Sequence, residues 1–215
     1  MPGFTWSQLV AGNERFIRGE PLHPRQDAER RAAITGSQAP RVAIFGCSDS
    51  RLSAEIIFDV GLGDAFVVRN AGQVISDSVV GSLEYAVSVL GVHLILVLGH
   101  DSCGAVRAAI NSVGPDALPL PPHIAELIAP IVPAVRRVTG TGDGETVDPD
   151  AVDEPRVGQE HLRDTIGELL ERSELIGAAI AEGQLAVVGA NYRLAEGRAV
   201  PDIVVGDISA PTSTK

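Results

Sequence analysis

Four short runs of apolar residues lie between longer segments that repeat apolar positions with helical spacing. Apolar and polar residues do not alternate within these runs, which cover Arg41–Gly46, Phe66–Arg69, Leu94–Leu98 and Leu185–Ala190. Such runs are typical of parallel strands buried on both faces of a sheet. The segments between them predict helices over Ala54–Val60, Ser78–Leu90, Ala105–Val113, Ile124–Val138 and about Glu160–Glu182. This order predicts an α/β fold with a mostly parallel central β-sheet flanked by helices.

Three segments depart from this pattern. Apolar positions recur at roughly helical spacing near the start, so residues 1–40 predict an N-terminal helical arm that packs on a neighbouring chain or on its own core. Residues 139–158 are rich in glycine, proline and acidic side chains and predict an exposed acidic loop. Residues 210–215 predict a frayed tail. Because no repeat or linker separates two cores, residues 1–215 are expected to form a single domain.

The charge and hydropathy of the chain exclude several classes of partner. The chain has 215 residues and a formal net charge of −11. Such a surface repels phosphates and anionic lipid, so we expect no nucleic acid and no membrane partner. The longest apolar run falls far short of the ~20 residues that a membrane span requires. The first residues lack the basic and apolar parts of a secretion signal, so we expect a cytoplasmic protein with reduced thiols.

The two cysteines, Cys47 and Cys103, stand with His100 directly after predicted strands. Without such neighbours, two cysteines are better interpreted as small buried apolar residues. Because the carboxyl ends of parallel strands meet at one edge of a sheet, these three side chains are expected to converge there. His100 and Cys103 are three residues apart in a turn that enters a helix, so they share one face. Two thiolates and an imidazole favour zinc and leave its fourth position for water or substrate.

Asp49 and Arg51 place a carboxylate and a guanidinium close to Cys47 in the sequence. The two side chains can form a bidentate pair. Alone, such a pair is an ordinary structural salt bridge, but next to Cys47 it becomes candidate catalytic machinery. A redox dithiol is disfavoured because the cysteines form no C-x-x-C unit. A nucleotide site is disfavoured because the glycines near Gly61 and Gly99 lack the G-x-G-x-x-G order.

Three stretches of this sequence resemble the β-class carbonic anhydrases. The run Cys47-Ser48-Asp49-Ser50-Arg51-Leu52-Ser53-Ala54 is similar to the first signature of that family. The second signature resembles Glu84-Tyr85-Ala86 and then Gly99-His100-Asp101-Ser102-Cys103-Gly104. Between them, Phe66-Val67-Val68-Arg69-Asn70-Ala71-Gly72 is also similar to family sequence. The similarity is strong over about residues 41–113, weaker over residues 159–206 and poor in the acidic loop.

The resemblance implies a Rossmann-like fold in which Cys47, His100 and Cys103 bind one zinc ion per subunit. Asp49 and Arg51 become the catalytic dyad for the reversible hydration of carbon dioxide to bicarbonate and a proton, by attack of zinc-bound hydroxide. Asp49 also becomes the fourth zinc ligand in an inactive state. We expect the backbone N–H of Gly104 to contact the substrate. The family further implies a homodimer, often paired into a tetramer, whose N-terminal helices embrace the partner.

Two features depart from the family pattern. A non-catalytic bicarbonate site in the family is built from Trp, Arg and Tyr. Arg69 and Tyr192 match it, but Ile44 stands at the Trp position, so we predict that this site is absent or weak. The turn over residues 58–63 lacks the Gln that many members carry near the substrate, so one polar substrate contact is expected to be missing.

Two alternative functions stay open at the level of sequence. Hydrolases of carbon disulfide or carbonyl sulfide share these motifs, and assays with sulfur substrates would distinguish them. A zinc-stabilised, non-catalytic interaction protein would instead keep Asp49 as a permanent fourth ligand. The remaining histidines are interpreted as surface or packing residues, namely His23, His93, His123 and His161.

Overall fold

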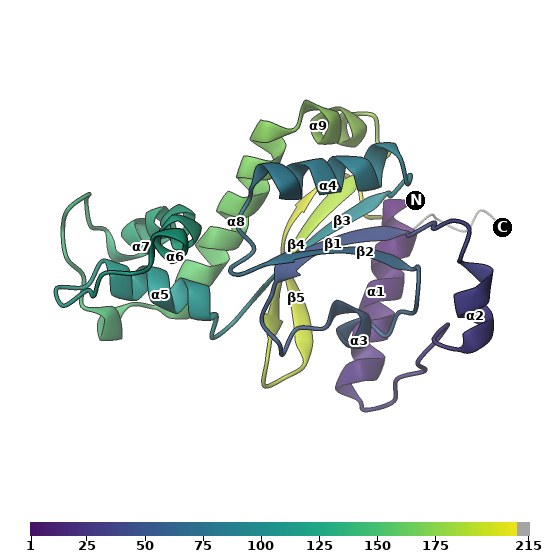
Figure 1. Cartoon of the computed structure of the whole chain (residues 1–215), viewed down its shortest axis with the longest axis horizontal. Helices are drawn as coiled ribbons and strands as arrows, with labels where there is room; N and C mark the ends of the chain where they lie inside the picture. The colour runs from purple at the N-terminus through teal and green to yellow at the C-terminus, as the bar shows by residue number, and fades with distance from the viewer. Residues whose placement is uncertain (210–215) are drawn as a thin grey trace.

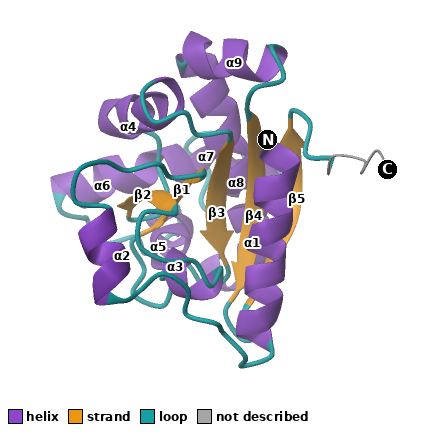
Figure 2. Cartoon of the chain, turned by 90° about the vertical axis from the view of Figure 1, so that its right-hand side faces the viewer, coloured by secondary structure: helices purple, strands orange, loops and turns teal. Residues whose placement is uncertain are grey.

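A five-stranded sheet, with strands in the order β2-β1-β3-β4-β5, forms the centre of the computed structural model, which describes residues 1–209 (Figure 2). The strands are β1 (Val42–Cys47), β2 (Ala65–Asn70), β3 (Leu94–His100), β4 (Ala186–Arg193) and β5 (Arg198–Val205). The first four run parallel, and β5 is antiparallel to β4. Every residue of β1 and β3 is buried. The predicted α/β fold with a mostly parallel sheet is therefore confirmed.

Helices cover both faces of the sheet (Figure 1). One face packs against α4 (Asp77–Ser88), α8 (Glu154–Arg172) and α9 (Glu174–Ala181). The other face packs against α1 (Pro2–Ile17) and α3 (Ala54–Ile57). A third apolar cluster lies beyond the carboxyl ends of the strands, among α5 (Gly104–Ser112), α6 (Pro122–Ile128), the 3-10 turn η1 (Ala129–Ile131) and α7 (Val132–Thr139). The short α2 (Ala28–Ala33) has no buried residue.

The N-terminal helix α1 packs on the core of its own chain. Leu9 is buried with the residues of β1 and β3 that face it. The side chain of Asn13 donates to the carbonyl oxygens of Ile57 at 3.2 Å and Gly197 at 2.8 Å. A Cβ at Gly12 would lie 1.9 Å from the carbonyl oxygen of Phe58, so glycine permits the close contact between α1 and α3. Of the two positions predicted for the arm, the structure shows the one on its own core.

The sequence predicts no strand over the residues of β5, because this segment contains a proline and pairs irregularly with β4. It contains Pro201, which cannot donate to a ladder and argues against a central strand. In the structure β5 is the outer strand of the sheet, where proline is tolerated, and its pairing with β4 shifts register between Gly189 and Ala190. The antiparallel hairpin is therefore built on a segment whose pattern is irregular.

Three predicted boundaries are wrong, two because a polar residue or a proline interrupts a predicted helix and one because a capping residue begins α8 earlier than expected. The helix expected over Glu160–Glu182 is two helices, since Ser173 ends α8 and its hydroxyl accepts the amide of Ile176 to begin α9. The helix expected over Ile124–Val138 divides around Pro130, which lies in η1. The loop expected over residues 139–158 contains a 3-10 turn, η2 (Pro149–Ala151), and ends where Asp153 caps α8.

Two further expectations concern regions outside the sheet. No helix within residues 1–209 combines the length and the hydropathy that a membrane crossing requires. The expected C-terminal tail, residues 210–215, lies outside the described residues.

Candidate metal centre

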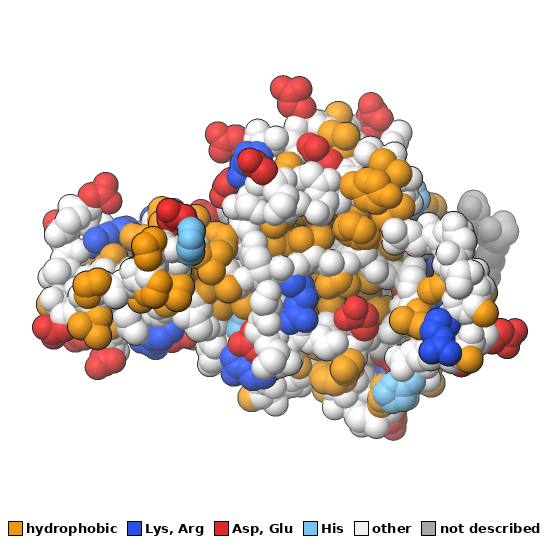
Figure 3. All heavy atoms as spheres, viewed as in Figure 1, with side chains coloured by type: hydrophobic (Ala, Val, Ile, Leu, Met, Phe, Trp, Pro, Cys, Tyr) orange, Lys and Arg blue, Asp and Glu red, His pale blue; other side chains and the backbone are white. Residues whose placement is uncertain are grey.

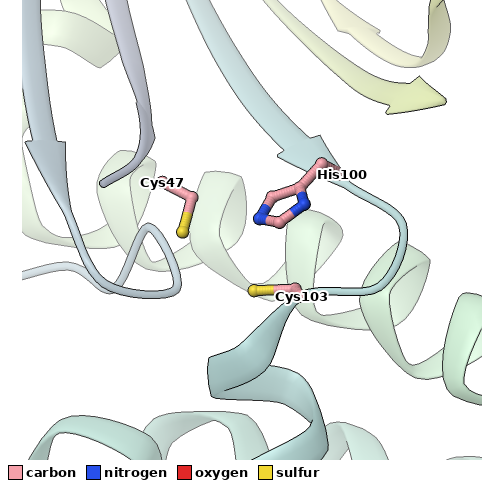
Figure 4. Close-up of side chains that lie close together, drawn as sticks. All are labelled: Cys47, His100 and Cys103. Carbon is pink, nitrogen blue, oxygen red and sulfur yellow. The ribbon is translucent and has the colours of Figure 1, made fainter. Parts of the chain in front are cut away.

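The side chains of Cys47, His100 and Cys103 meet at the carboxyl edge of the sheet (Figure 4). Cys47 ends β1, His100 ends β3, and Cys103 directly precedes α5. One ligand atom from each lies within 4.8 Å of the other two. In Figure 4 the imidazole ring and the two sulfur atoms point toward one another. The predicted convergence of these strand ends is confirmed, while the role of the three residues as ligands stays a prediction.

The imidazole of His100 is oriented to offer a lone pair to the two sulfur atoms. Its Nδ1 lies 2.8 Å from the carbonyl oxygen of Asp101. A carbonyl only accepts, so in the neutral ring Nδ1 carries the proton and Nε2 does not. Nε2 is buried and has no hydrogen-bond partner among the described residues. An unprotonated, buried nitrogen that faces two sulfurs fits the donor set of a zinc ion.

The two sulfur atoms differ in how readily they lose a proton. The pKa of Cys47 is lowered to about 4, chiefly by the hydrogen bond from the Cys103 thiol, which outweighs the effect of burial. The backbone N–H of Gly72 also donates to the Cys47 sulfur, at 3.3 Å. The pKa of Cys103 is raised, because its thiol donates to Cys47 and because it is buried. Cys47 therefore carries the thiolate, which is the form that binds metals.

Asp49 and Arg51 form the bidentate pair that their spacing predicts. Asp49 Oδ1 accepts from Arg51 Nε at 2.9 Å, and Oδ2 accepts from Nη2 at 2.6 Å. Nη2 also donates to the carbonyl oxygen of Ser102 at 3.1 Å, which links the pair to the turn between His100 and Cys103. The Arg51 hydrogen bonds hold the pKa of Asp49 well below its usual range. The carboxylate is thus ionised and turned toward Arg51, outside the group of three ligand atoms.

Arg69 braces the backbone that carries Cys47 and Asp49. Its Nε donates to the carbonyl oxygen of Cys47 at 2.9 Å, and its Nη2 donates to that of Asp49 at 2.7 Å. No local sequence pattern predicts this role. Arg69 lies on β2, and only the register of β2 beside β1 brings it to these carbonyls.

Gly104 begins α5, directly after Cys103. Its N–H belongs to the first turn of a helix, where amides have no acceptor within the helix. A Cβ at this position would meet nothing within 4 Å, so packing inside the chain does not require glycine here. The position is compatible with the predicted backbone contact to a substrate, which stays a prediction.

The geometry of this centre agrees with comparisons to known proteins. Residues 42–199 match the family model described as carbonic anhydrase. The chain belongs to the carbonic anhydrase family. It is 47% identical over 207 residues to carbonic anhydrase 2 of Mycobacterium tuberculosis, with 96% of each chain covered. It is 44% identical to carbonic anhydrase of Mycolicibacterium smegmatis, again with 96% of each chain covered.

Solved structures support the same assignment for this carbonic anhydrase family member. One of two β-carbonic anhydrases of Sordaria macrospora, described as tetrameric, superposes with a TM-score of 0.69 and 25% identity, covering 92% of this chain and 96% of that one. A Coccomyxa β-carbonic anhydrase in complex with acetazolamide gives a TM-score of 0.66 and 26% identity, covering 81% and 78%. The predicted family, the fold and the enzyme class of carbonate dehydratase are therefore confirmed.

Proposed function

We propose that this enzyme catalyses the reversible hydration of carbon dioxide to bicarbonate and a proton, with one zinc ion per subunit. The observation that carries the proposal is the meeting of two buried sulfurs with the buried, unpartnered Nε2 of His100 beside the Asp49–Arg51 pair. Cys47, His100 and Cys103 would hold the ion. Bound zinc would lower the pKa of a water in its fourth position toward ~7 and so supply the nucleophile.

The remaining residues of the centre orient the reactants. Asp49 can accept a hydrogen bond from the nucleophile, because Arg51 keeps its carboxylate ionised. Arg51 fixes the direction of that carboxylate through two hydrogen bonds and is itself held by the Ser102 carbonyl. The backbone N–H of Gly104 would donate to a substrate oxygen. Opening of the Asp49–Arg51 pair would let Asp49 act as a fourth ligand and stop catalysis.

Zinc content and hydration rate together test this function. We expect the purified protein to contain about one zinc per chain and to lose carbon dioxide hydration when a chelator removes it. Added zinc should restore the rate. Carbon disulfide and carbonyl sulfide should be poorer substrates than carbon dioxide. Protein without stoichiometric metal, or a higher rate with a sulfur substrate, would overturn the proposal, and zinc without any of these activities would favour an interaction protein.

We propose that this protein lacks the non-catalytic bicarbonate site of the family, because the space for it is too small. The cavity beside Ile44 and Arg69 has a volume of only about 10 Å³. That is roughly the space that one water molecule needs. Arg69 already donates to two backbone carbonyls there. We expect hydration rates to be insensitive to rising bicarbonate at constant pH and ionic strength. Steep, cooperative inhibition in that titration, absent with an equal concentration of chloride, would contradict this expectation.

We propose a homodimer, able to pair into a tetramer, in the cytoplasm. The parallel strand β2 is the other outer strand of the sheet, and its Phe66 and Val68 are only partly buried. Beside β2, two large apolar side chains are exposed: Tyr85 of α4, and Val89, which directly follows the last residue of α4. Hydrophobic side chains gather over this part of the surface in Figure 3. A second copy would cover this region, which sedimentation velocity of the purified protein would detect. Both cysteines are free, as a reducing compartment requires.

A further inference from the structure

His161 is a buried polar residue for which the mechanism above gives no role. It lies on α8 and is only 2% exposed. Its Nε2 lies 2.7 Å from the carbonyl oxygen of Gly72. Because a carbonyl only accepts, Nε2 carries the proton and Nδ1 is left as an acceptor. Nδ1 is buried and has no partner among the described residues. Such an atom carries a desolvation cost, which a purely structural apolar residue at this position would avoid.

The hydrogen bond from the His161 ring to Gly72 reaches the loop that touches the metal centre. Gly72 accepts from His161 through its carbonyl oxygen and donates its N–H to the Cys47 sulfur at 3.3 Å. This N–H therefore meets one of the three candidate ligand atoms directly. Hydrogen bonds to ligand sulfurs tune how such ligands hold a metal.

The loop that carries Gly72 adopts a backbone conformation that needs support. Gly72 has φ +78°, and the next residue, Gln73, has φ +43° although it is not glycine. A Cβ at Gly72 would lie 2.7 Å from the Cβ of Ala105 on α5, so only glycine fits against that helix. Non-glycine residues in this region of backbone space persist only where their surroundings fix them.

Three side chains fix this loop from different directions. Asn70 joins the two ends of the loop: Oδ1 of its side chain accepts from the N–H of Val74 at 2.9 Å, and Nδ2 donates to the Val74 carbonyl oxygen at 2.7 Å. Thr165 of α8 makes a long contact of 3.4 Å with the carbonyl oxygen of Gln73. His161 makes the short bond at Gly72 itself. Of the three, only His161 holds the residue whose N–H reaches the sulfur.

We propose that His161 is a positioning residue for the metal centre, which holds Gly72 in place through its carbonyl oxygen so that the N–H of the same residue donates to the Cys47 sulfur. This inference rests on the proposed function in one respect, because it takes Cys47 to be a zinc ligand. His161 does not contact the ligands or the substrate. Its loss lets the strained backbone at Gly72 and Gln73 relax, withdraws the N–H from the sulfur and weakens the hold on the metal.

The test compares zinc affinity in full-length variants at this position. His161→Leu keeps the site apolar and removes the donor, and it is expected to raise the zinc dissociation constant by roughly 10–100-fold, as loss of a supporting hydrogen bond does. Competition with a chromophoric chelator measures that constant. The near-ultraviolet sulfur-to-cobalt band of the Co²⁺-loaded protein should shift as well, because the hydrogen bond to the sulfur is lost.

A conservative pair of variants separates the donor from the bulk of the ring. The side-chain amide of glutamine extends about as far as Nε2 of histidine, so His161→Gln should restore most of the zinc affinity and the cobalt band. Asparagine is one bond shorter and should behave like leucine. If His161→Leu does not fold, the contrast between glutamine and asparagine carries the test alone.

A control on the same helix separates positioning from general stability. Leu169 is fully buried on α8 and belongs to the cluster against the sheet. Leu169→Ala should lower the melting temperature but leave the zinc dissociation constant and the cobalt band unchanged.

The proposal is overturned if His161→Leu binds zinc as tightly as the wild type with an unshifted band, or if His161→Gln and His161→Asn lose affinity equally. Failure of the proposed function is a different result, because the wild type itself would then bind no stoichiometric metal.

Discussion

Cys47→Ser is expected to purify without stoichiometric zinc and without measurable carbon dioxide hydration. Serine is close in size, so the change replaces a soft thiolate by a hydroxyl that stays protonated and is a poor zinc ligand. Loss of a supporting hydrogen bond costs metal sites roughly 10–100-fold in affinity, and loss of one of three ligands should cost more. His100→Ala should give the same result, because it removes the lone pair of Nε2. Metal analysis and stopped-flow hydration on the same samples measure both effects.

A neighbouring residue supplies the control for this first prediction. Ser48 adjoins Cys47 in the chain and is not one of the three candidate ligands, which are Cys47, His100 and Cys103. Ser48→Ala should therefore keep a full equivalent of zinc. The ligand variants should also unfold at a lower temperature than the zinc-loaded wild type, because metal bound only by the folded state stabilises it. A Cys47→Ser protein that retains one zinc per chain would remove this cluster from consideration as the metal site.

The order of strands made the position of the centre predictable from the sequence. Unbroken apolar runs indicated parallel strands, and parallel strands present their carboxyl ends at one edge. Cys47, His100 and Cys103 each follow such a strand, so the sequence predicts that they converge, and the geometry agrees. The Asp49–Arg51 pair was predictable for a simpler reason, since the two residues are close in sequence.

Interactions between distant segments were not predictable in the same way. Arg69 reaches the carbonyls of Cys47 and Asp49 because β2 runs beside β1 in one particular register, and no local pattern encodes that register. No strand is predicted over β5, because Pro201 cannot donate to a ladder and so argues against a strand there. His161 left a usable signal. It lies four residues after Val157 and four before Thr165, and all three are buried on the same side of α8. That signal needs the correct start of α8, because Val157 falls within the segment expected to be a loop.

Asp49→Asn is expected to separate metal binding from catalysis. Asparagine keeps the size of the side chain but loses its charge, so it no longer accepts strongly from the nucleophile or pairs with Arg51. Zinc should stay bound, because Asp49 lies outside the group of ligand atoms. We expect kcat/KM to fall by about 10²-fold or more, the usual scale for a positioned proton acceptor. Metal content and stopped-flow rates of the same preparation distinguish this result from the loss of zinc in Cys47→Ser.

The pH dependence of the two dyad variants sharpens this last prediction. The Arg51 hydrogen bonds lower the pKa of Asp49, so its carboxylate stays ionised as the pH falls from 8 to 5 and does not set the acid limb of the wild-type profile. In Arg51→Gln the pKa of Asp49 rises back toward ~4, which still leaves it ionised at pH 8. That variant keeps the charge of the carboxylate but loses the pair that holds it away from the metal, so Asp49 can take the fourth position on zinc. At pH 8 it should therefore be as inactive as Asp49→Asn while it retains its zinc. Near-wild-type rates in Asp49→Asn would show that the charge of Asp49 has no part in the reaction, and near-wild-type rates in Arg51→Gln would show that Arg51 is not needed to keep Asp49 off the metal.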